Sequence, residues 1–207
     1  MNTVDAKELF GNNYIGKDEL ALFIKRIGGN LDNIPDCPIS YSDSVLERAA
    51  KEGYILILGI NQIQGRNLDL LFLRKIFGID PDKSEPCFYN QDWYMHEDFM
   101  TFRLETQWYL IKKHVIEDSR AVMPADLLHK GINFPPALLC AYTFFAYYYA
   151  KGEMLWYHDF VWCRDTDHNG DRIYVGKYHD VDGVNKNGFS IHRHLALRNC
   201  YASISTI

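Results

Sequence analysis

The sequence predicts a single-domain α+β protein with a mainly antiparallel sheet, two or three packing helices and a C-terminal β-hairpin region. The chain has 207 residues, of which 47% are hydrophobic and 24% charged, so it can bury a core without crosslinks. Helical patterns dominate before residue 152, and closely spaced turn signals follow it. Helices segregated from consecutive hairpins favour α+β over an alternating α/β fold.

The first 78 residues are expected to hold three helices and one strand. Residues 16–28 carry apolar side chains at helical spacing and end at two glycines. Further helices are predicted over residues 42–51 and 68–77, each followed by a glycine. Residues 54–58 form an apolar run bounded by glycines, which is typical of a buried strand.

The middle of the chain is dominated by aromatic residues. Residues 87–94 and 107–111 are predicted as strands that contain Trp-Tyr pairs. Residues 137–150 follow two prolines and are predicted as a helix that is apolar almost all round. Because such a helix is usually buried, we expect it in the core.

The last third of the chain is expected to consist of hairpins. Asn169-Gly170 is the strongest short signal for a hairpin turn. The residue alternation between the turns places Tyr174 and Tyr178 on one face of a strand and Ile173 and Val175 on the other. The strands are predicted over residues 160–163, 172–178, 189–194 and 195–204.

Charge and motifs restrict the function classes. The net charge is −5, and no basic region suits a nucleic acid. The longest apolar stretch, residues 134–150, is too short and too interrupted to span a membrane, and the N-terminus lacks a signal-peptide pattern. Neither GxGxxG nor GxxxxGK[ST] occurs, so no cofactor is expected. We therefore expect a cytoplasmic protein, with residues 1–41 as a helix-and-loop appendage and residues 42–207 as the main domain.

Two metal interpretations are open in the last third. Asp165, Asp167, Asn169 and Asp171 alternate as in a calcium loop, with Gly170 at the sixth position. The twelfth position is a glycine rather than the bidentate Glu, so a hairpin turn is preferred. A transition-metal site is the other possibility, because five of the eight histidines fall in this region, although no HxxxH or HExxH spacing occurs. These are His158, His168, His179, His192 and His194.

The order of parts after Trp162 resembles the C-terminal end of C-type-lectin-like domains of the formylglycine-generating-enzyme type. That order is a Trp-bearing strand, a turn, an aromatic strand around Tyr174, two glycine turns and a closing strand through Tyr201. Such domains serve as variable proteins of diversity-generating retroelements. The Glu-Pro-Asn signature and the paired cysteines of true lectins are missing, and so are recognisable formylglycine cysteines. The resemblance therefore implies a scaffold with a binding surface.

The sequence favours a non-enzymatic binding module that uses the C-terminal hairpin surface, residues 160–207, for an unknown protein or small ligand. Aromatic and Arg side chains are frequent interface anchors. Two alternatives are open: a hydrolase with a His/Asp metal site or a Cys–His pair, and a structural subunit of a larger assembly. The expected binding residues are Trp162, Arg164, Tyr174, Tyr178, His179, Asp182, Asn185, Asn187, His192, His194 and Arg198.

Overall fold

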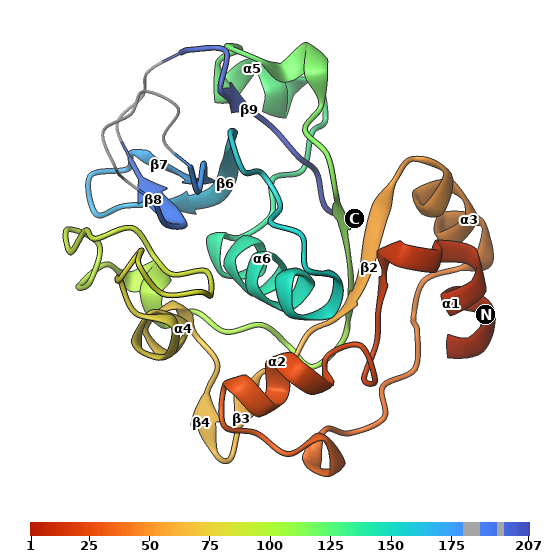
Figure 1. Ribbon diagram of the computed structural model, residues 1–207. Helices are drawn as coiled ribbons and strands as arrows, with labels where there is room; N and C mark the ends of the chain where they lie inside the picture. The colour runs from red at the N-terminus through yellow and green to blue at the C-terminus, as the bar shows by residue number, and fades with distance from the viewer. Residues whose placement is uncertain (180–186, 194–196) are drawn as a thin grey trace.

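The computed structural model describes residues 1–179, 187–193 and 197–207. Their helices and mixed sheets confirm the predicted α+β class (Figure 1). Several short 3-10 turns join the helices. The helices among the described residues are α1 (Thr3–Phe10), α2 (Ala21–Arg26), α3 (Asp43–Lys51), α4 (Leu70–Phe77), α5 (Pro124–His129) and α6 (Ala137–Lys151), and the 3-10 turns are η1 (Gly11–Asn13), η2 (Leu31–Asn33), η3 (Asp98–Thr101) and η4 (Glu117–Ser119).

The strands of the described residues form two main sheets and one small hairpin. The N-terminal sheet has the order β1-β2-β5, and the C-terminal sheet has the order β8-β7-β6-β9. Two pairs, β1 with β2 and β6 with β9, are parallel, and the other pairs are antiparallel. The strands are β1 (Tyr14–Ile15), β2 (Tyr54–Leu58), β3 (Gln62–Ile63), β4 (Arg66–Asn67), β5 (Trp108–Lys112), β6 (Phe160–Thr166), β7 (Arg172–Gly176), β8 (Ser190–His192) and β9 (Tyr201–Ala202).

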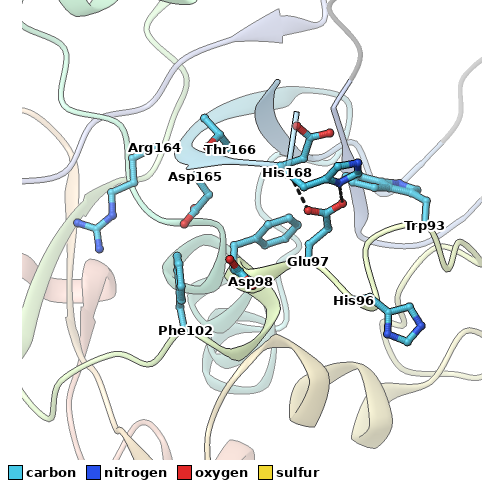
Figure 2. A pocket seen from close by; sticks show the side chains of 11 residues that line it. Trp93, His96, Glu97, Asp98, Phe102, Arg164, Asp165, Thr166 and His168 are labelled. Carbon is cyan, nitrogen blue, oxygen red and sulfur yellow. Dashed lines mark hydrogen bonds and ion pairs between the residues drawn. The ribbon is translucent and has the colours of Figure 1, made fainter. Parts of the chain in front are cut away.

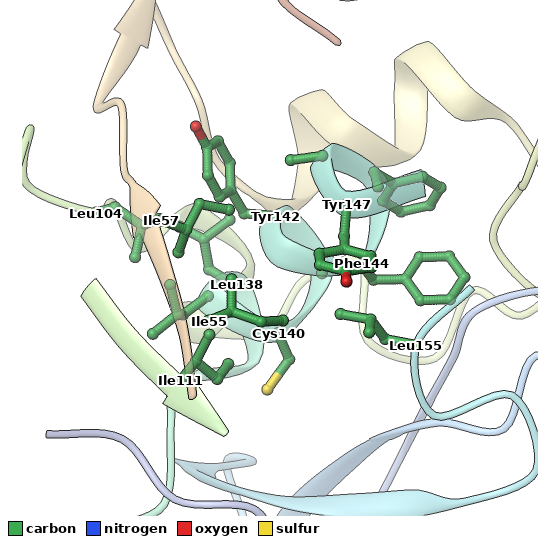
Figure 3. Packing of buried hydrophobic residues seen from close by; sticks show 14 of the residues in the cluster. Ile55, Ile57, Leu104, Ile111, Leu138, Cys140, Tyr142, Phe144, Tyr147 and Leu155 are labelled. Atoms are coloured by element: carbon green, nitrogen blue, oxygen red, sulfur yellow. The ribbon is translucent and has the colours of Figure 1, made fainter. Parts of the chain in front are cut away.

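Helix α6 lies between the two sheets and is buried on every side (Figure 1). All residues from Ala137 to Tyr147 are buried, as the apolar sequence predicts. Figure 3 shows Ile55, Ile57 and Ile111 of the N-terminal sheet packed beside this helix. The buried Tyr142 hydroxyl in this contact is satisfied, because it donates to the Leu58 carbonyl at 2.8 Å.

The first 41 residues, expected as an appendage, share this core. Tyr14 and Ile15 of β1 pair with Leu56 and Ile57 of β2, and the Phe23 ring of α2 meets the Tyr142 ring edge-on at a centroid distance of 5.3 Å. Their side chains are buried together with those of α6.

Two predicted strands are wrong. The segment expected over residues 87–94 makes only an isolated bridge, from Phe88 to Phe189, because Phe88 and Tyr94 are buried as single anchors within a loop. The strand expected over residues 195–204 is reduced, in its described part, to Tyr201–Ala202, which runs parallel to β6. It therefore does not close an antiparallel hairpin.

The outer face of the C-terminal sheet is covered by a second cluster of buried side chains, which we call the aromatic cluster. It lies under the segment that contains α5, a helix that the sequence pattern did not indicate. Its members are Leu127, Phe134, Phe160, Trp162, Tyr174 and Tyr201. No helix of the described chain is long and apolar enough to cross a bilayer.

Replacing Phe145 by Ala tests the importance of the α6 core. The Phe145 ring stacks on Phe77 at a centroid distance of 4.0 Å and also contacts Phe88 and Phe189. We expect Phe145→Ala to lower the free energy of unfolding by about 3–5 kcal/mol, because it leaves a cavity in a packed core. Chemical denaturation measures this. Leu22→Ala, at a side chain that is 63% exposed on α2, should change it by less than about 0.5 kcal/mol.

Candidate functional site

A pocket of about 650 Å³ lies between the loop that contains η3 and the turn end of the β6–β7 hairpin (Figure 2). We call it the hairpin pocket. Its volume falls within the range of small-molecule sites. One wall comes from the loop and the other from the end of β6 and the turn. Its lining residues are Trp93, His96, Glu97, Asp98, Phe99, Phe102, Arg164, Asp165, Thr166, Asp167 and His168.

The loop wall is held in place by buried aromatic anchors. Phe99 of η3 and Tyr94 are buried, and the Trp93 indole N–H donates to the Ile191 carbonyl at 3.2 Å. Arg74 of α4 donates to the Tyr94 hydroxyl at 3.2 Å. These contacts leave the intervening polar residues facing the pocket, and the ring of Phe102 is 50% exposed at its rim.

The hairpin wall is fixed by the start of α6. The buried Asp165 carboxylate accepts a hydrogen bond from the Ala137 backbone N–H at 2.6 Å, and the Arg164 N–H donates to the Pro135 carbonyl at 3.0 Å. The carboxylate satisfies one of the unpaired N–H groups at the helix start and lies at the positive end of the helix dipole. Burial nevertheless raises the pKa of Asp165, although the Ala137 N–H and Arg164 oppose this.

The segment from Asp165 to Asp171 comprises the end of β6 and a hairpin turn over residues 167–171, as the Asn-Gly pair predicts. Asp167 accepts hydrogen bonds from the backbone N–H groups of Asn169 and Asp171, at 2.9 and 2.8 Å. The Asp165 carboxylate instead accepts its hydrogen bond from the Ala137 N–H at the start of α6. The two buried carboxylates therefore bind different parts of the chain. Gly170 has a φ of +86°, which the turn requires.

Glu97, Asp167 and His168 form the one group of three or more potential metal ligands in the described part of the chain, with ligand atoms within 4.8 Å of one another. An internal cation already occupies this group. The Arg193 guanidinium lies 3.0 Å from Asp167 and 3.8 Å from Glu97, and 4.7 Å from the centroid of the Trp93 ring. Glu97 also accepts from the His168 backbone N–H and contacts the His168 ring at 2.6 Å. A metal ion here would have to displace Arg193.

The aromatic residues that the sequence placed at the binding surface are buried. Trp162 and Tyr174 belong to the aromatic cluster, and the Trp162 indole N–H has no hydrogen-bond partner among the described residues. Tyr178 packs on Phe144 in the main core. The expected alternation of β7 fails at Lys177, whose φ of +42° ends the strand and turns Tyr178 inward. These three side chains therefore offer no exposed stacking surface.

The remaining predicted binding residues are scattered. Arg164 and Arg198 are exposed, and His179, Asn187 and His192 are half-buried. Only Arg164 lines the hairpin pocket, whereas the His192 ring stacks on Tyr174 at a centroid distance of 5.5 Å. Three further candidates lie outside the described residues: Asp182, Asn185 and His194.

The cysteines do not resemble activated nucleophiles. Cys163 is fully buried, and burial raises its pKa, as does the neighbouring thiol of Cys140. Burial likewise raises the pKa of Cys87, Cys37 and Cys200. Nucleophilic cysteines have a lowered pKa instead. No observation therefore favours the Cys–His form of the hydrolase alternative.

The loop wall was not among the candidates from the sequence. Trp-Tyr pairs are commonly core anchors with a hydrogen-bonded tip. Tyr94 is buried and Trp93 packs against the core with its indole N–H bonded, but the Trp93 ring also lines the pocket. The available signal was the run His96-Glu97-Asp98 between aromatic residues, in a segment without strand or helix periodicity. Its partner, His168 in the turn after β6, is 71 residues away along the chain, and only the fold brings the two together.

Replacing Asp167 by Asn should make the stability of the protein less dependent on acid pH. Burial raises the pKa of Asp167, but the N–H groups of Asp171 and Asn169 and the Arg193 guanidinium outweigh it, so its pKa is lowered. Asp167 therefore stabilises the fold above its unfolded pKa of about 3.9, and this contribution is lost as the pH falls through the folded value.

We expect Asp167→Asn to lower the free energy of unfolding at pH 7 by about 1–3 kcal/mol, with a smaller difference at pH 3. Denaturant titrations at both values measure this. Asp118→Asn, at an exposed carboxylate on η4, is the matched control and should have little effect at either pH. An equal loss at pH 7 and pH 3 for Asp167→Asn would show that its charge does not matter.

Comparison with known proteins adds no identification. Neither protein-family models nor curated proteins nor solved structures give a match to this chain. The similarity of the C-terminal segment to C-type-lectin-like domains therefore stays a prediction. The function must be argued from the geometry of the molecule itself.

Proposed function

We propose that this protein is a non-enzymatic binding module, and that the hairpin pocket receives a positively charged group, such as a guanidinium or an ammonium, of its ligand. The observation that carries the proposal is the pairing of carboxylates with exposed aromatic surface. The exposed Asp98 and the buried Asp165 line the pocket together with the half-exposed ring of Phe102 and the mostly buried ring of Trp93. Figure 2 shows Asp98, Asp165 and Phe102 grouped in one part of it.

The charge balance supports a cationic ligand. Four carboxylates line the pocket, those of Glu97, Asp98, Asp165 and Asp167. Arg193 and His168 engage Glu97 and Asp167, and the start of α6 engages Asp165. No described side chain pairs with the Asp98 carboxylate, so it is available to a ligand. A charge-assisted hydrogen bond to an ionised group contributes about 1.5–3 kcal/mol.

The same loop wall already binds a guanidinium from within the chain. Arg193 lies over the Trp93 ring and beside two carboxylates, which is the combination that recognises arginine side chains. Asp98 and Phe102 also combine a carboxylate with an aromatic ring, and they line the pocket. No arginine or lysine among the described residues is paired with Asp98. The exposed Arg164 on the opposite wall provides a donor for a carboxylate or carbonyl of the same ligand.

The resemblance to C-type-lectin-like variable proteins fits a binding module whose contacts are made by hairpin ends. In this chain the proposed pocket includes Arg164 from the predicted binding set, while the buried aromatic residues of that set support the sheet. The ligand is either a small amine or a basic side chain of a protein partner. Both would present a positively charged guanidinium or ammonium group to the pocket.

Binding of N-acetyl-arginine amide and of an arginine-containing peptide, followed by two-dimensional NMR, tests the proposal. We expect saturable shifts in residues 96–102 and 164–168. Asp98→Asn should weaken binding about tenfold or more because it removes the ionised acceptor. Phe102→Ala should weaken it by a smaller factor. A stronger response to the peptide would indicate a protein partner, and a stronger response to the amide would indicate a small ligand.

The controls lie at exposed positions outside the pocket: Asp118→Asn repeats the change made at Asp98, and Leu22→Ala removes an exposed apolar side chain, as Phe102→Ala does. Both should bind as the wild-type protein does. The proposal is wrong if the shifts map elsewhere, or if Asp98→Asn and the wild-type protein bind the cation equally.

A further inference from the structure

Two histidines meet at the other end of the β6–β7 hairpin, away from the hairpin pocket. His158 precedes β6, and His179 follows β7. Their ring centroids are 5.7 Å apart, with an interplanar angle of 78°. The Tyr157 ring stacks on His179 at 5.2 Å and 1° and meets His158 edge-on. We call His158 and His179 the histidine pair.

The backbone around the histidine pair is braced in an uncommon conformation. Trp156 and Lys177 have φ values of +50° and +42°, which non-glycine residues adopt rarely. The Lys177 N–H donates to the carbonyls of Trp156, at 3.0 Å, and Asp159, at 2.6 Å, and the His179 N–H donates to the Tyr157 carbonyl at 3.1 Å. Such strain persists only where the surrounding structure enforces it. The two imidazoles are therefore held together before any ligand binds.

The ring nitrogens of the histidine pair are available. The imidazole of His158 is exposed and that of His179 is half-buried. Within the described parts of the chain, neither ring takes part in a hydrogen bond or an ion pair, only in ring contacts. The carboxylate of Asp159, the residue after His158, is paired with Arg120 at 2.6 Å, so the charge of this arginine is neutralised.

The spacing of the rings suits a shared metal ion. Bonds of about 2.0–2.1 Å from each nitrogen place the imidazole centroids about 3.2 Å from the ion. Two imidazoles on one ion then have centroids about 5 Å apart at a tetrahedral angle and about 6.4 Å apart at most. The separation of 5.7 Å lies between these limits. Imidazole suits copper, nickel and zinc, and water can complete the coordination sphere.

We propose that His158 and His179 together bind one divalent transition-metal ion, with solvent in the remaining positions. The site is independent of the hairpin pocket, since it uses other residues at the opposite end of the hairpin. His168 and His192 do not belong to it, because the former is bound to Glu97 and the latter stacks on Tyr174.

Calorimetric titration of the untagged, metal-stripped chain with NiCl₂, and in parallel with ZnCl₂, tests this site. We expect saturable binding of one ion per chain, and at least a tenfold loss of affinity in His158→Ala and in His179→Ala. His129→Ala, at an exposed histidine on α5, is the matched control and should bind as the wild-type protein does. With Cu²⁺, the electron paramagnetic resonance spectrum should show two coordinated imidazole nitrogens in the wild-type protein and one in either variant.

His158→Gln is a second variant, which roughly keeps the size and polarity of the exposed side chain. Thermal melting in the absence of metal verifies that each variant is folded. The proposal is overturned if the double variant His158→Ala/His179→Ala binds nickel as tightly as the wild-type protein. It is equally overturned if the wild-type protein shows no saturable binding at millimolar metal.

Discussion

The burial of helix α6 on all sides is the constraint on which the rest of the structure depends. A helix without a polar face requires a cover on every side, and here the two sheets, α2 and α4 provide it. The first residues of the chain are part of that cover. The same burial leaves the N–H groups at the start of α6 in need of an acceptor, and the Asp165 carboxylate of β6 supplies one.

This attachment determines where the C-terminal hairpin can present side chains. One face of β6 and β7 packs on α6, and the other face is closed by the aromatic cluster. Among the described residues of the hairpin region, exposed side chains lie at its two ends. The turn end forms the hairpin pocket with the η3 loop, and the opposite end carries the histidine pair. The proposed functions therefore lie at the ends of the hairpin rather than on its faces.

The elements with a strong local pattern could be predicted from the sequence. The all-round apolar run of α6, the glycine-bounded strand β2 and the Asn-Gly turn each carry their own signal. Strands of two residues such as β1 have none, because their pairing partner lies far along the chain. The segment from Cys87 to Tyr94 has strand-like composition, but its large side chains are buried one at a time in a loop.

The candidate sites were less predictable, for physical reasons. Residue alternation assumes a regular strand, and the positive φ of Lys177 turns Tyr178 into the core. The second cluster, which buries Trp162 and Tyr174, depends on a distant segment around α5. The pocket joins two segments that meet only in the folded chain. Clusters of polar residues in the sequence predicted a region for the candidate site, but not which of its residues meet.

Native-state hydrogen exchange of the α6 amides tests the central role of this helix most directly. If the two sheets and the helix stabilise one another, the amides from Leu138 to Tyr147 should exchange only through global unfolding, with opening free energies equal to the global value. Residues 96–102 of the pocket loop should exchange through smaller local openings. Exchange of the α6 amides at a clearly lower free energy than global unfolding would contradict this account.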